Sequence, residues 1–182
     1  MVSSVAEKNL FDWKFLGHSV HCLRIIPEAH KSENNKDKGP AILFIHGFGA
    51  STAHWRHNLP VIGKHYEVHA LDLLGFGKSA KPGGIAYGGP LWKEQIVAYV
   101  QENIGRPTIL VGNSLGGYAA LASGAALGDQ AAGVVLLNAA GYFSEDKKNT
   151  IGFWATARKT VAGIFLKNAL LQRMIFENLR RP

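Results

Sequence analysis

The chain of 182 residues lacks several features that would assign its class directly. It has one cysteine, so no internal disulfide can form, and Cys22 falls in an expected strand, where we interpret it as a reduced structural thiol. No apolar run approaches the roughly 20 residues that span a bilayer, and no basic segment followed by an apolar one opens the chain. We therefore expect a soluble protein of the cytoplasm.

Other absences argue against a metal site and against a phosphate-binding loop. No cysteines and histidines have the spacing of zinc ligands, and no histidine pair is backed by carboxylates, so we expect no metal. Gly77-Lys78-Ser79 is similar to the end of a phosphate-binding loop, but Asp72 stands where that loop needs its first glycine and would repel phosphate. An ATPase is thus disfavoured, and we expect Asp72 and Ser79 to fix a turn through side-chain hydrogen bonds.

The net charge of +7 is concentrated at one end of the chain. Residues 1–146 hold 12 basic and 12 acidic side chains, whereas 147–182 hold eight basic residues and Glu177 alone. A neutral main part argues against nucleic acid as a partner. The basic and apolar end is typical of an amphipathic helix, which would form a cap over a lipophilic substrate, contact a membrane surface through 150–181, or remain as exposed apolar surface.

The order of apolar segments predicts a mainly parallel α/β sheet flanked by helices. Strands are expected over 11–16, 18–26, 41–45, 66–71, 108–111 and 133–137. Helices are expected from Ser51 or Thr52 to about 63, over 91–104 and over 115–127. This alternation is typical of right-handed strand-helix-strand units. We expect the N-terminal part of an incomplete core over 1–146 and the start of a helical cap or lid over 147–182.

Ser114 is the strongest candidate for chemistry. It lies in the sequence Gly112-Asn113-Ser114-Leu115-Gly116, between a buried-type strand and a helix rich in small residues. Gly112 and Gly116 leave room for a sharp turn that would hold the serine oxygen at the carboxyl edge of the sheet. An ordinary glycine-rich turn is the alternative. We favour a nucleophile.

A second motif, His46-Gly47-Phe48-Gly49, ends an earlier central strand. Its glycines would let a backbone N–H point into the same crevice, so the N–H groups of Phe48 and Leu115 are candidate oxyanion donors. The alternative is a tight turn from strand to helix. Both motifs fall at carboxyl ends of strands, where open α/β sheets bind ligands.

These two motifs, together with Asp72-Leu73-Leu74-Gly75-Phe76-Gly77-Lys78-Ser79, resemble the α/β-hydrolase superfamily over about residues 11–145. Trp55-Arg56-His57-Asn58 and Asn138-Ala139-Ala140-Gly141 are similar to a cyanobacterial and plastid-type branch that also resembles pheophytinases and chlorophyll dephytylases. The resemblance implies Ser114 as nucleophile, Phe48 and Leu115 as oxyanion donors, and a helical cap after the last strand. It also implies a plastid or cyanobacterial interior as a possible location.

The resemblance also implies the order serine, acid, histidine, yet no histidine follows Ser114. All histidines precede it: His18, His21, His30, His46, His54, His57, His65 and His69. We expect His46 to shape the oxyanion loop, and His54 and His57 to lie on a surface helix, so none of them is favoured as a base. Glu145 and Asp146 follow the strand after which some relatives carry the acid, but we favour a helix cap there.

The interpretation is a serine-dependent hydrolase of carboxylic esters, lipophilic by resemblance, whose triad is incomplete in this chain. Serine at position 114 argues against dehalogenases and epoxide hydrolases, which carry aspartate there. The reaction requires no cofactor. A complementary chain would supply the acid and the base, and without them we expect weak activity. The alternatives are a non-catalytic module that binds a lipophilic ligand or a membrane surface, and a truncated fragment.

Overall fold

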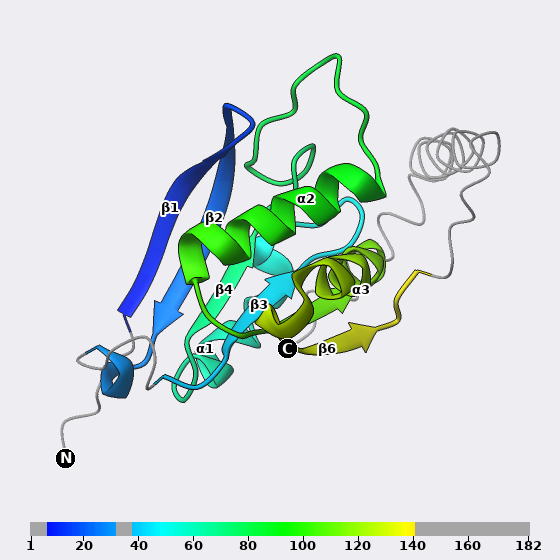
Figure 1. Cartoon of the computed structure of the whole chain (residues 1–182). Helices are drawn as coiled ribbons and strands as arrows, with labels where there is room; N and C mark the ends of the chain where they lie inside the picture. Colours follow the sequence, from blue (N-terminus) through cyan, green and yellow to red (C-terminus); the bar gives the residue numbers. More distant parts are fainter. Residues whose placement is uncertain (1–6, 32–37, 141–182) are drawn as a thin grey trace, which may run out of the picture. The chain divides into compact units, whose positions relative to one another are not determined.

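The computed structural model describes residues 7–31 and 38–140, which belong to one compact unit of the chain (Figure 1). The expected cap segment over 147–182, with its basic helix, lies outside the described residues, as do Glu145 and Asp146. None of the helices within the described ranges is both long enough and apolar enough to cross a membrane.

A six-stranded sheet forms the centre, in the order β1-β2-β4-β3-β5-β6. Strands β4, β3, β5 and β6 run parallel to their neighbours, while β1 and β2 form an antiparallel extension on the β4 side. The predicted mainly parallel sheet is thus confirmed. The strands are β1 (Glu7–Phe15), β2 (His18–Ile26), β3 (Ala41–Ile45), β4 (Val68–Leu71), β5 (Thr108–Asn113) and β6 (Ala131–Leu137).

The parallel pairing of β3 with β5 positions the site. Ile45, the last residue of β3, is in register with Gly112 near the end of β5. The chain therefore leaves both strands at the same edge of the sheet. This register brings the segment from His46 onward next to Ser114, as expected for a ligand site of an open α/β sheet.

Helices cover both faces of the sheet. Figure 1 shows α2 (Gly89–Tyr99) and α3 (Leu115–Leu127) together on one face. On the opposite face, η2 (Thr52–Trp55) and α1 (Leu59–Ile62) pack on a core that includes Phe44 and Val68. The remaining short helices are η1 (Glu28–His30), η3 (Val100–Ile104) and η4 (Gly128–Gln130).

One expected helix, from Ser51 or Thr52 to about residue 63, is instead two short helices, η2 and α1. Pro60 explains the break, because it has no N–H to donate to the carbonyl of Arg56 and its ring would clash there in a continuous helix. The start is as expected: the Ser51 hydroxyl caps η2 by accepting the N–H of Ala53 at 3.3 Å.

Candidate active site

Ser114 occupies the turn between β5 and α3 with a strained backbone. Its φ of 53° and ψ of −118° lie in a region that residues with a side chain rarely adopt. Four backbone hydrogen bonds hold this conformation. The Ser114 N–H donates to Leu137 O at 3.0 Å, and the Ser114 carbonyl accepts from the N–H groups of Ala140, Gly117 and Tyr118 at 2.9, 3.0 and 3.3 Å. Leu137, at the end of β6, and Ala140, after it, therefore help to stabilise the strained backbone of Ser114.

The glycines on either side of Ser114 are required by close backbone contacts. A Cβ on Gly112 would lie 2.2 Å from the carbonyl oxygen of Gly116. A Cβ on Gly116 would lie 2.2 Å from the carbonyl oxygen of Ile45 at the end of β3. Only glycine fits at either position, so that α3 starts immediately against both strands.

The segment after β3 lies against Ser114. A Cβ on Gly47 would lie 3.2 Å from the Cβ of Ser114, so the backbone of Gly47 passes close to Ser114. The next residue, Phe48, is 46% exposed at this edge of the sheet, and Gly49 has a φ of 68°. The structure thus brings Gly47, Phe48 and Gly49 together with Ser114.

Leu115 is the first residue of α3, and its side chain is buried. The N–H groups in the first turn of a helix have no acceptor within the helix, and the helix dipole makes this end positive. The Leu115 N–H is therefore one of the N–H groups at the positive end of α3, directly after Ser114.

His46 is fully buried and both of its ring nitrogens are engaged. Its Nε2 accepts the N–H of Leu73 at 3.0 Å, so the proton is assigned to Nδ1, which donates to Gly47 O at 2.7 Å. Burial lowers the pKa of His46. The neutral ring therefore fixes the segment that carries Gly47 and Phe48, and it has no lone pair left for the Ser114 hydroxyl.

Asp72 organises the loop after β4. It is buried, and its carboxylate accepts the N–H of Thr52 at 2.6 Å and the N–H of Lys78 at 2.7 Å. The Ser79 hydroxyl donates to the Asp72 carbonyl at 2.6 Å. Gly77, with a φ of 51°, packs directly on the carboxylate. The expectation that Asp72 and Ser79 fix this turn is confirmed.

Sequence reasoning missed an aromatic cluster beside the candidate site. The ring of Phe76 contacts those of Phe48, His46 and Trp92, with centroids 5.3, 5.8 and 5.7 Å apart. The available signal was Phe76 itself, flanked by two glycines in a loop that leaves the carboxyl end of a strand. The cluster gives this edge of the sheet an apolar, aromatic surface.

No histidine hydrogen-bonds to the Ser114 hydroxyl within the part of the chain that the structure describes. The buried His69 is engaged elsewhere, with Glu67 and Tyr99. His54 and His57 are exposed at and after η2. The described residues thus hold Ser114 in a strained turn at the start of α3, and no histidine hydrogen bond to its hydroxyl is present among them.

The chain was compared with protein-family models, with curated proteins and with solved structures. The model of the α/β hydrolase family matches residues 42–180. The chain is 33% identical to a chloroplastic pheophytinase of Arabidopsis thaliana over 130 residues, which cover 55% of this chain and 27% of that protein. It is 36% identical to a pimeloyl-[acyl-carrier protein] methyl ester esterase of Aeromonas hydrophila, over 46% of this chain and 31% of the esterase.

A solved structure agrees with the curated relatives. The crystal structure of a membrane phospholipase A described as a bacterial virulence factor superposes with a TM-score of 0.66 and 28% identity, over 77% of this chain and 42% of that one. The chain thus spans less than half the length of each of these three proteins. With a family match over most of its length, this chain belongs to the α/β-hydrolase family.

Proposed function

We propose that this chain carries the nucleophile and the oxyanion hole of a serine-dependent hydrolase of carboxylic esters. The observation that carries the proposal is the strained backbone of Ser114 at the turn from β5 into α3, close to Gly47. Strain of this kind costs about 1–3 kcal/mol and persists at sites where it serves a function. An ordinary glycine-rich turn would place a residue with a relaxed backbone there.

In the proposed reaction the Ser114 oxygen attacks the ester carbonyl carbon. The N–H groups of Phe48 and Leu115 hold the negative charge that develops on the carbonyl oxygen. The alcohol leaves with a proton, and water then releases the acid from the acyl-enzyme. The base that takes the serine proton, and the acid that orients it, would come from a segment outside these 182 residues or from a complementary chain, because no histidine follows Ser114.

The proposed substrates are lipophilic esters. Phe48 and Phe76 form an aromatic surface next to Gly47, which favours an apolar acyl or alcohol group over a charged one. The names of the two curated relatives are consistent with this class, since one is a pheophytinase and the other a methyl ester esterase. A plastid or cyanobacterial location is part of the same proposal, supported by the chloroplastic relative.

A fluorophosphonate probe tests the nucleophile. We expect slow but specific labelling of the 182-residue chain at Ser114, located by peptide mass mapping, and no adduct at that position in Ser114→Ala. Ser19→Ala, in β2, is the matched control and should label as the parent does. A folded chain that labels on many serines equally, or nowhere, would contradict the proposal and favour the non-catalytic binding module.

Hydrolysis of p-nitrophenyl butyrate tests the missing base. Removing a triad's base typically leaves only the contribution of the oxyanion hole and of binding, roughly a thousandfold or more below full activity. We therefore expect the chain and Ser114→Ala to hydrolyse this ester at similar, near-background rates. A fast rate that Ser114→Ala abolishes would mean that an upstream histidine or a second copy supplies the base.

A further inference from the structure

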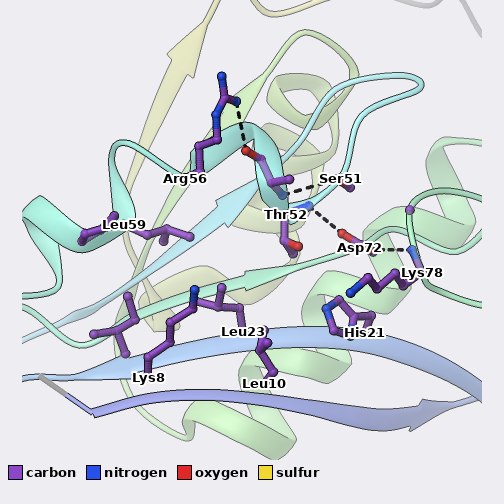
Figure 2. A pocket seen from close by; sticks show the side chains of 14 residues that line it. Lys8, Leu10, His21, Leu23, Ser51, Thr52, Arg56, Leu59, Asp72 and Lys78 are labelled. Carbon is purple, nitrogen blue, oxygen red and sulfur yellow. Dashed lines mark hydrogen bonds between the residues drawn. The ribbon is translucent and has the colours of Figure 1, made fainter.

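A cavity of about 300 Å³ opens on the face of the sheet that carries η2 and α1. It lies between the β1–β2 hairpin and these two helices, and Figure 2 shows it from close by. Ser114, Phe48 and Leu115 are not among its lining residues. The proposed ester hydrolysis therefore makes no use of this space.

The floor of the cavity is apolar. Leu23 and Ile25 of β2 and Leu59 of α1 line it, and all three belong to the buried core on this face. Leu10 of β1 lines it as well but is 56% exposed. Leu10 thus keeps apolar surface in contact with water, where a hydrocarbon chain would displace that water at about 25 cal/mol per Å² of apolar surface buried.

Two lysines supply positive charge above this floor. In Figure 2, Lys8 from β1 and Lys78 from the loop after β4 extend into the space from two sides, whereas Arg56 points away and donates to Ala53 O at 3.3 Å. Neither Lys8 nor Lys78 has a carboxylate partner among the residues that the structure describes, in contrast to Lys31, which pairs with Glu28 at 2.8 Å.

The carboxylate of Asp72 is the acidic group among the lining residues, and it is directed to the backbone. It is 1% exposed, and its two oxygens accept the N–H groups of Thr52 and Lys78. Among the described residues it forms no ion pair with the ammonium group of Lys8 or Lys78. His21, also at the edge of the cavity, lies 3.4 Å from Asp12 outside it.

We propose that this cavity binds a single-chain amphiphile with an anionic head group, specifically a medium-chain fatty carboxylate. The hydrocarbon chain packs along Leu10, Leu23 and Leu59, and the carboxylate pairs with the ammonium groups of Lys8 and Lys78. The volume lies at the small end of the roughly 300–1,000 Å³ range of ligand pockets, which favours one short chain over a two-chain lipid. This site is independent of Ser114.

The test uses the fluorescence of a dansyl-labelled undecanoic acid with the 182-residue chain, and its displacement by decanoate. We expect Lys8→Gln and Lys78→Gln each to weaken decanoate binding roughly fivefold, the effect of losing about 1 kcal/mol of charge attraction. Both side chains are exposed, so the variants should fold. Lys14→Gln is the matched control, because Lys14 is an exposed lysine of the same strand that does not line the cavity.

A fourth variant and a ligand of opposite charge keep the test decisive. Leu10→Glu changes an exposed position and places negative charge on the floor, so it should weaken decanoate more than either lysine variant. Decyltrimethylammonium, with the same chain and opposite charge, should compete poorly. The proposal is overturned if all four variants bind decanoate equally, if the cationic amphiphile competes as well as decanoate, or if binding begins only where decanoate forms micelles.

Discussion

Hydrogen-bond partners decide what each buried titratable residue does in this chain. Glu67 has no exposed side-chain surface and accepts hydrogen bonds from Arg24, Arg106 and His69, at 2.7, 2.8 and 3.0 Å. Burial alone would raise the pKa of Glu67, but the bonds from His69 and Arg106 hold that pKa well below its usual value. His69 Nδ1 accepts the Tyr99 hydroxyl at 3.0 Å, so Nε2 carries the proton. This network ties β2, β4, α2 and the start of β5 together.

The two buried histidines should make stability depend on pH. Burial lowers the pKa of both His46 and His69 below the ordinary value of 6.5. Below pH 6.5 the unfolded chain therefore binds protons that the folded chain does not. The free energy of unfolding should fall as the pH falls, by up to about 1.4 kcal/mol per pH unit for each histidine, and level off below the folded-state pKa values.

Urea unfolding followed by tryptophan fluorescence between pH 7.5 and 5 measures this dependence. His69→Gln should reduce the slope of stability against pH, at the cost of lower stability throughout, because Gln cannot reproduce both bonds of the ring. His57→Gln, at an exposed position, should leave the slope unchanged. A stability that does not vary across this pH range would show that neither buried histidine resists protonation.

Some of these residue roles could be predicted from the sequence and others could not. The turn at Ser114 and the turn that Asp72 and Ser79 fix could be predicted, because short motifs of glycine and polar residues indicate each of them. The partners of Glu67 lie 43 and 39 residues away, at Arg24 and Arg106. Nothing in the local pattern of either segment indicates that pairing, since it depends on the strand order of the folded sheet.

At the scale of elements, apolar periodicity predicted which segments form strands and helices, but not where each one stops. Helix α3 has the expected bounds, because the turn at Ser114 and Gly128 with its φ of 55° limit it on both sides. Strand β1 begins earlier than expected, at Glu7, because its pairing with Ile26 extends the ladder over polar residues. The hydrophobicity of the sequence does not indicate cross-strand bonds of this kind.

The junction of β3, β5 and α3 should be intolerant of a single methyl group. Within a helix, Gly→Ala ordinarily stabilises by up to about 1 kcal/mol. At Gly116 the new Cβ would lie 2.2 Å from the Ile45 carbonyl oxygen and 2.5 Å from that of His46. Because backbone atoms cannot rotate away, the overlap should outweigh the propensity, and Gly116→Ala should lose roughly 1–3 kcal/mol or more.

Chemical denaturation of Gly116→Ala beside Gly83→Ala measures this effect. A Cβ on Gly83, in the loop before α2, would meet no atom within 4 Å, and Gly83 has no positive φ. Gly83→Ala should therefore unfold within about 0.5 kcal/mol of the parent. Equal stability of the two variants would mean that α3 can move away from β3, and the close contact would then not be what positions Ser114.

At the scale of the whole molecule, the fold class could be predicted because alternation of strands and helices determines it. The same alternation does not indicate whether the chain contains all the catalytic residues of the site. The strained turn at Ser114 and the aromatic surface of Phe48 and Phe76 come from the loops after β3, β4 and β5, which this chain contains. The base and acid of the family's triad follow the serine in sequence, and the chain spans 27–42% of the three relatives compared here.

The β6 edge of the sheet, as far as the described residues show it, should make the chain associate with itself. Strand β6 pairs only with β5 among the described strands, and its Val135, Leu136 and Leu137 are 44, 43 and 40% exposed. An apolar edge with unpaired backbone groups can pair with the same edge of a second copy.

Light scattering after size exclusion should show a mass that rises with protein concentration. Val135→Lys should suppress this rise, because charged residues on an edge oppose pairing, whereas Val61→Lys on α1, equally apolar and 61% exposed, should not. A monomeric parent at all concentrations, or equal suppression by both variants, would show that β6 is not the surface responsible.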